Sequence, residues 1–177
     1  MPISTYNRIY ETYFESESYR ADHRNALELL KKYDRIFFVG NGGSNAICSH
    51  MMEDYAKIAR FKTQTFSDPA LITCFANDYG FENAMYEWIR LNGDSKSLLV
   101  AISSSGESLN ILGAAKAAQE CEMGVITLSG FKRDNQLKIQ GHINFHIDIE
   151  NYGIVECFHQ VILHVLLDDY ALSNHIN

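Results

Sequence analysis

Short apolar runs that alternate with helical patterns constrain the fold of this chain most strongly. RIFFVG at 35–40 is a continuous apolar run ending in glycine, which is typical of a strand buried on both faces of a sheet. SLLVAIS at 97–103 and GVITLSG at 124–130 indicate two more strands. Between them lie segments whose apolar residues recur at helical spacing. This alternation predicts an α/β fold with a parallel sheet covered on both faces.

The remaining segments complete a three-layer sandwich. KTQTFS and the alternating INFHIDI bring the expected parallel strands to five, and DPALITCFAND reads as a short helix or turn. A chain of 177 residues suits a single domain. We expect one domain over 1–177, in which a helix over 4–32, either continuous or broken, precedes a sheet core over 35–150 and a final helix over 152–173.

Composition limits the partners of the protein. A net charge of −7 argues against a broad nucleic-acid surface, although backbone N–H groups and hydroxyls could still hold a small anion. The start of the chain is polar, and no apolar run approaches the roughly 20 residues of a membrane span. The four cysteines form no CxxC pair and are expected to be buried free thiols. We therefore expect a cytoplasmic protein without nucleic-acid or membrane partners.

Two loops rich in glycine and serine follow two of the predicted strands. In GNGGSN the glycines let the backbone approach a ligand closely, and in SSSGES the hydroxyls add donors at the start of a helix. The carboxyl ends of parallel strands meet at one edge of the sheet, where ligands of open α/β sheets bind. Together the loops predict a neutral, donor-rich cradle for an anion. Its candidate residues are Asn41, Gly42, Gly43, Ser44, Ser103, Ser104, Ser105 and Ser108.

Better-known phosphate-binding motifs do not fit these loops. The chain has no GxxxxGK[ST] pattern, and GNGGSN lacks the third glycine of GxGxxG. Either loop alone could be an ordinary strand-to-helix turn with a serine cap. The presence of both, each after an apolar strand, favours binding of a phosphate or sugar.

Two helices carry candidate acid–base or metal-binding groups. His50 and Asp54 are four residues apart and share a helix face, with Glu53 beside them. Such a pair suits zinc, but a solvated helix face would show the same spacing. On the apolar last helix, Glu156, Gln160 and His164 form an i, i+4, i+8 stripe. A carboxylate and an imidazole there are costly unless paired, although a satisfied core histidine is a common alternative.

Several segments in this order resemble the sugar isomerase (SIS) family, and more closely its phosphoheptose isomerases. They are VGNGGS, SDPALITCFANDYGFE, LLVAISSSGES, MGVITLSG and HQVILHVL, within about residues 35–170. The resemblance implies the SIS fold and an enzyme that converts sedoheptulose 7-phosphate to D-glycero-D-manno-heptose 7-phosphate through an enediol. It also implies a homotetramer.

The resemblance also assigns roles to residues. A divalent metal, zinc in the family, is implied at His50, Asp54, Glu156 and His164. The chain departs from the family at two of these positions, since the usual Glu is Asp54 and the usual Gln is Glu156. Asp54 is implied as the base and His164 as the acid, with Glu53 a possible substitute for the shorter Asp54.

Substrate contacts follow from the same resemblance. Ser103, Ser105 and Ser108 are implied to hold the phosphate, and Asn41 and Ser44 the phosphorylated seven-carbon sugar. Asn77 and Asp78 in NDYGF are expected to support the site, although an Asx turn before glycine explains them equally well. Two other readings stay open: an isomerase of another sugar phosphate, and a non-catalytic SIS protein that binds a phosphosugar or a bacterial replication initiator. Retention of four side chains able to ligate a metal favours an enzyme.

Overall fold

The structure, a computed structural model, describes residues 2–176 and contains one five-stranded parallel sheet. The strands are β1 (Arg35–Gly40), β2 (Lys62–Thr65), β3 (Ser97–Ser103), β4 (Gly124–Gly130) and β5 (Ile143–Ile147), in the order β2-β1-β3-β4-β5. Phe38 pairs with Val100, and Val100 pairs with Ile126. The predicted α/β sandwich is confirmed. Because β1 and β3 are neighbours, the two loops that follow them meet at one edge of the sheet.

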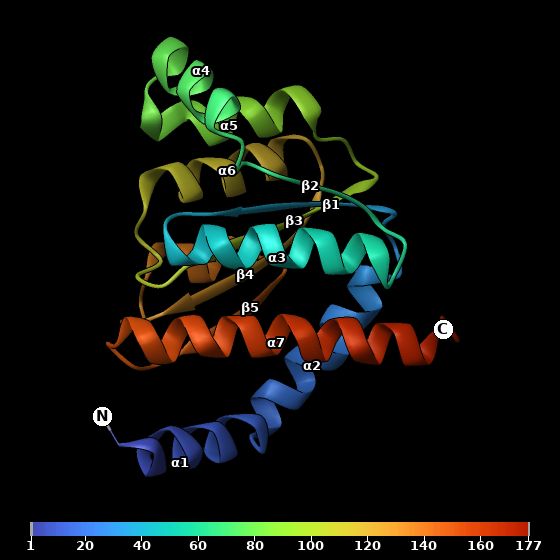
Figure 1. Ribbon diagram of the computed structural model, residues 1–177, viewed down its shortest axis with the longest axis vertical. Helices are drawn as coiled ribbons and strands as arrows, with labels where there is room; N and C mark the ends of the chain where they lie inside the picture. The colour runs from blue at the N-terminus through green and yellow to red at the C-terminus, as the bar shows by residue number, and fades with distance from the viewer. Residues whose placement is uncertain (1, 177) are drawn as a thin grey trace.

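Helices cover both faces of the sheet, as Figure 1 shows. One layer holds α4 (Pro69–Tyr79), α5 (Phe81–Asn92) and α6 (Leu109–Glu120), and the other holds α2 (Glu17–Leu30), α3 (Gly43–Lys57) and α7 (Tyr152–Ser173). Successive strand residues point to opposite faces, so Phe37 packs under the first layer and Phe38 under the second. Both side chains are fully buried. The apolar runs recognised in the sequence therefore serve two cores at once.

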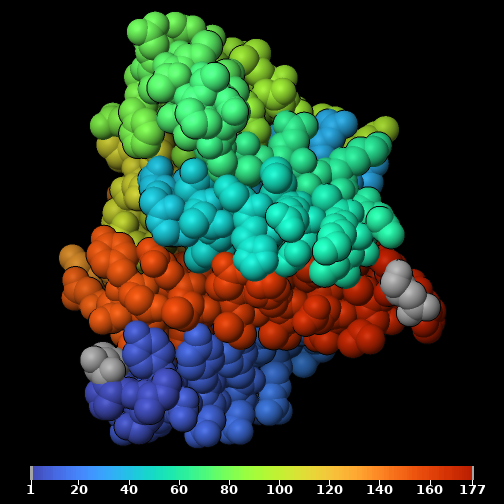
Figure 2. All heavy atoms as spheres, viewed as in Figure 1, coloured from blue at the N-terminus to red at the C-terminus, as the bar shows by residue number. Residues whose placement is uncertain are grey.

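The amino-terminal segment forms two helices with a break between them. α1 (Ile3–Phe14) ends just before Ser16, which begins α2 as its N-cap and accepts a hydrogen bond from the backbone N–H of Tyr19. Tyr10 and Phe14 of α1 stack on Phe158 of α7, with ring centroids 4.1 and 5.7 Å apart. Figure 2 shows α1 packed against the first half of α7.

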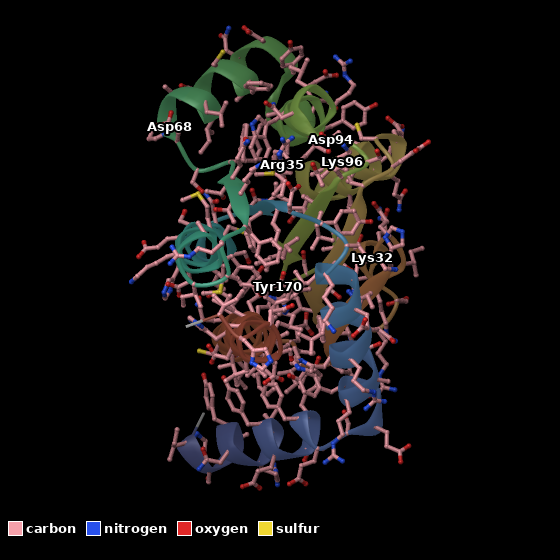
Figure 3. The ribbon with its side chains drawn as sticks, turned by 90° about the vertical axis from the view of Figure 1, so that its right-hand side faces the viewer. Lys32, Arg35, Asp68, Asp94, Lys96 and Tyr170 are labelled. Atoms are coloured by element: carbon pink, nitrogen blue, oxygen red, sulfur yellow. The ribbon has the colours of Figure 1, made fainter. Side chains whose placement is uncertain are left out.

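The amino ends of β1 and β3 are joined by polar groups that satisfy one another. Asp94 accepts hydrogen bonds from Arg35, from the backbone N–H of Lys96 and from Ser97. The Ser97 hydroxyl is the main reason why the pKa of Asp94 lies below its usual value. Figure 3 shows Arg35, Asp94 and Lys96 grouped together.

α7 lies beside α3, and the two helices run in the same direction (Figure 1). The hydroxyl of Tyr55, late in α3, donates to the backbone carbonyl of Leu163 in α7 at 2.9 Å. Ile162 and Leu166 of α7 are buried in the core beside this contact. Core packing therefore fixes the register of α7 relative to α3. The stripe of Glu156, Gln160 and His164 on α7 lies against the exposed side of α3.

The short helix predicted from NQLKI is the 3-10 helix η1 (Gln136–Ile139).

Candidate active site

A cavity of about 150 Å³ lies where β1 and β3 end and α3 and α6 begin. Most of the residues that line it carry a hydroxyl group. The polar lining residues are Asn41, Ser44, Ser103, Ser104, Ser105, Ser108, Tyr152 and Glu156. The structure thus brings both predicted loops to one cavity, and helix starts with free N–H groups at such a site favour an anion.

Glycine is required at two points where the chain passes from β1 into α3, beside the cavity. Gly42 has φ +53 and is the residue from which α3 starts, a conformation that side chains rarely adopt. At Gly43 a Cβ would lie 2.6 Å from Oε1 of Glu156. The absence of a side chain at Gly43 therefore makes room for the Glu156 carboxylate at the positive end of the α3 dipole.

Two amides join the loops across the cavity. Nδ2 of Asn41 donates to Oδ1 of Asn110 at 2.9 Å, and Nδ2 of Asn110 donates to Oδ1 of Asn41 at 2.8 Å. Asn110 is buried in the first turn of α6. No motif in the sequence indicates Asn110, and its one signal is that of a polar residue inside an alanine-rich helix.

One hydroxyl of the cavity has no partner. Ser104 is buried, and its Oγ makes no hydrogen bond to any described residue. The neighbouring Ser103 Oγ instead donates to Ser108 Oγ at 3.3 Å and accepts from the backbone N–H of Gly106. A buried hydroxyl without a partner is costly, and Ser104 is one of the residues that line the cavity.

A cluster of two imidazoles and a carboxylate lies further along α3 and α7. Asp54 Oδ2 is 3.1 Å from Nε2 of His50 and 3.9 Å from Nδ1 of His164. The ring centroids of the two histidines are 5.2 Å apart. The side chain of Asp54 is 17% exposed and those of His50 and His164 are 52% and 37% exposed, so the cluster is open to a substrate.

The cluster fits a divalent metal. The ligand atoms of His50, Asp54 and His164 all lie within 4.8 Å of one another. A tetrahedral zinc ion with bonds of about 2.1 Å separates its ligands by roughly 3.4 Å. The distances from Asp54 Oδ2 to the two imidazole nitrogens, 3.1 and 3.9 Å, lie on either side of this ligand separation. Gly43 and His50 are seven residues apart on α3, which places the cluster roughly 10 Å along the helix from the cavity.

Other predicted site residues lie outside this cluster. Glu156, predicted as a metal ligand, contributes to the serine cavity beside Gly43 and is not in the group of converging ligand atoms. Gln160 lies between the two histidines instead, a place that its position on the stripe alone did not reveal.

Three further candidate residues are exposed and lie away from the cavity lining. Glu53 is exposed. Asn77 and Asp78 are exposed at the end of α4, where they bond to each other and do not line the cavity.

The fold and the serine cavity define the class of SIS-domain proteins. Residues 5–130 match the SIS domain family. A phosphoheptose isomerase of Laribacter hongkongensis is 34% identical over 81% of this chain and 78% of its own length. One from Fusobacterium nucleatum is 29% identical over 94% and 91%. The structure of the phosphoheptose isomerase GmhA from Neisseria gonorrhoeae superimposes with a TM-score of 0.84 and 25% identity over 95% of this chain and 94% of that one.

The chain belongs to the phosphoheptose isomerase family of SIS-domain proteins. It is therefore an enzyme of the sugar-phosphate isomerase type. Within residues 2–176, no helix combines the length and the apolar character that a membrane crossing needs.

Proposed function

We propose that this protein is a metal-dependent isomerase that converts sedoheptulose 7-phosphate to D-glycero-D-manno-heptose 7-phosphate through an enediol. Its relatives of 29–34% identity carry the name phosphoheptose isomerase. The observation that carries the proposal is the convergence of His50, Asp54 and His164 about two helical turns from an anion cradle. One extended sugar phosphate can then contact both places.

The phosphate end of the substrate would lie in the serine cavity. Ser103, Ser104, Ser105 and Ser108 supply hydroxyls there, and the start of α6 adds free N–H groups. Asn41 and Ser44 lie on the side of the cavity from which α3 leads to the imidazoles. They are suited to the sugar hydroxyls, with Gly42 and Gly43 allowing close approach of the backbone.

The reacting carbons would lie at the imidazole cluster. Isomerisation removes a proton from the carbon beside the carbonyl and returns one to the former carbonyl carbon. Asp54 is the proposed base, and His164 the proposed acid for the oxygen. A divalent ion, with zinc as the first choice, would be held by His50, Asp54 and His164 and would stabilise negative charge on the enediol oxygens.

A second candidate is isomerisation of a different sugar phosphate. Glu156 places a carboxylate at the cavity, where it would accept hydrogen bonds from sugar hydroxyls and repel a second phosphate. That charge favours a substrate whose hydroxyls face Glu156, and the stereochemistry of the sugar decides whether they do.

Assembly and location are further parts of the proposal. The cluster is exposed on the α3–α7 face, and a neighbouring copy could cover it in a homotetramer like the one that the resemblance implies. The four cysteines are free, which suits the reducing cytoplasm. The expected burial is wrong for three of them, since only Cys48 is buried and both Cys74 and Cys157 are exposed.

A direct assay tests the function. The purified protein is incubated with sedoheptulose 7-phosphate, with zinc or with a chelator, and the aldose phosphate is followed. We expect product only with metal, and loss of turnover in Asp54→Asn. Glu53→Gln is the matched control, and its inactivation with a functional Asp54→Asn would move the base to Glu53. Turnover of other sugar phosphates alone would support the second candidate, and zinc binding without any turnover would overturn both.

A further inference from the structure

The side-chain amide of Gln160 lies between the two imidazoles of the cluster. Its Nε2 is 3.3 Å from Nδ1 of His50 and 2.9 Å from Nε2 of His164. The other nitrogen of each ring faces Asp54, at 3.1 Å for His50 and 3.9 Å for His164. Each imidazole is thus bounded by the Asp54 carboxylate on one side and by the Gln160 amide on the other.

This arrangement has a consequence for the ring protons. A neutral imidazole carries one N–H, and a nitrogen that binds a metal must offer its lone pair. If the nitrogens facing Asp54 bind an ion, the protons lie on Nδ1 of His50 and Nε2 of His164. Both of these N–H groups then face Gln160.

A glutamine amide can satisfy both protonation patterns. Its oxygen has two lone pairs and can accept from both rings, while its nitrogen has two protons and can donate to both. A half-turn of the amide exchanges the two atoms in place. In this structure Nε2 of the amide faces both rings, so the amide donates when the ring nitrogens facing it carry no proton, and the ring protons then lie on the nitrogens that face Asp54.

We propose that Gln160 is the positioning residue of this centre, and that it fixes the tautomer and orientation of His50 and His164 through one amide group. The inference rests on the proposed metal site. Partners of metal-ligating histidines commonly fix the ring in this way, and their loss weakens metal binding. Gln160 acts from outside the ligand set and touches neither substrate nor metal.

The helix holds Gln160 rigidly enough for this role. Its neighbours Phe158, His159 and Ile162 are buried in the core, and its amide also lies 3.9 Å from Sδ of the buried Met51. Glu156, one turn earlier on the same stripe, is directed to Gly43 and the serine cavity. The two polar residues of α7 thus have separate places, with Glu156 facing the cavity and Gln160 facing the imidazoles.

Zinc titration of the full-length protein separates these roles. We expect Gln160→Met, which keeps the side-chain length but removes both hydrogen bonds, to weaken zinc binding by about 10–100-fold. Gln160→Glu should bind zinc at least as tightly as the starting protein, because a carboxylate accepts from both rings. Glu156→Ala should leave the zinc affinity unchanged, because Glu156 lies at the serine cavity and outside the group of converging ligand atoms. Circular dichroism confirms that each variant is folded.

Nitrogen-15 NMR of the histidine rings provides the second readout. With zinc bound, the proton should be on Nδ1 of His50 and on Nε2 of His164, and Gln160→Met should broaden or mix these signals. Equal zinc affinity in Gln160→Met, or the opposite tautomers, would overturn the inference. Loss of zinc binding in Glu156→Ala alone would instead make Glu156 the ligand. Zinc binding controlled by Gln160 in a protein that turns over no sugar phosphate would leave this inference standing and remove the proposed reaction.

Discussion

Two histidines of α7, only five residues apart, lie in opposite environments. His159 is fully buried, and its Nε2 lies 3.3 Å from the carbonyl oxygen of Ser129. Burial lowers the pKa of His159 to about 4. His164 is 37% exposed and lies against Asp54, Gln160 and His50. One ring is held neutral inside the sheet–helix core, and the other lies partly exposed beside the Asp54 carboxylate.

The difference shows that a histidine on an apolar helix is not by itself a functional signal. His159 and His164 share the same helix and similar apolar sequence neighbours. Their roles are separated by the rotation of about 100° per residue around a helix. The five-residue offset directs His159 to β4 and His164 to α3. Substitutions at the two positions should therefore affect different properties.

The largest expected effect is on turnover by His164→Ala. Loss of a positioned acid lowers kcat by about 10²–10⁴-fold, and loss of a ligand should also weaken zinc binding. Steady-state kinetics with sedoheptulose 7-phosphate measures the first effect. His159→Gln is the matched variant and should retain most of kcat. Equal losses of kcat in the two variants would remove the distinction between them.

The next effect is on the pH dependence of stability and belongs to His159. Its folded pKa, about 4, lies below the model-peptide value of 6.5, so only the unfolded chain takes up a proton between these values. Stability should therefore be greatest above pH 6.5 and should fall by about 2–3 kcal/mol as the pH drops toward 4. Urea unfolding at several pH values measures this slope. His159→Gln should have a shallower slope, and an unchanged slope would show that His159 does not cause it.

A smaller effect is expected for the unpartnered hydroxyl of the cavity. Ser104→Ala removes a buried donor that has no partner within the described chain, so the stability of the free protein should not fall. KM should rise by about tenfold, which corresponds to about 1.5 kcal/mol, the lower end of what a hydrogen bond to a charged group contributes. Thermal unfolding measures the stability, and steady-state kinetics measures KM. A loss of stability with an unchanged KM would make Ser104 a structural residue.

The smallest effect concerns the contact between Gly43, at the start of α3, and Glu156 of α7. Gly43→Ala places a methyl group against the Glu156 carboxylate and should raise KM modestly by displacing it. In a Glu156→Ala background the same substitution should cost less, with a coupling of about 1 kcal/mol. A double-mutant cycle on KM measures the coupling. Additive effects on KM would mean that Gly43 and Glu156 do not interact.

Much of the fold was predictable from local patterns. Continuous apolar runs identified the central strands, and the glycine and serine loops after β1 and β3 predicted a shared edge. The sequence alone does not decide whether the helix over 4–32 is broken, because a serine cap such as Ser16 and a serine inside a helix look alike until the following turn is seen.

The site was predictable only in part, because it depends on how two helices pack. Spacing placed His50 with Asp54 on one face and Gln160 with His164 on another. Which members of the α7 stripe face α3 follows from the register set by core packing and by Tyr55 bonding to Leu163. No local pattern encodes that register, so Glu156 and Gln160 could not be assigned from spacing alone.

Anomalous diffraction at the zinc edge, on crystals grown with zinc, would show whether the imidazole cluster is a metal centre. We expect a single strong peak within about 2.2 Å of one nitrogen of His50, one oxygen of Asp54 and one nitrogen of His164. The Glu156 carboxylate should stay beside Gly43. A zinc ion bound elsewhere, with His50 and His164 both free of it, would contradict the proposed centre.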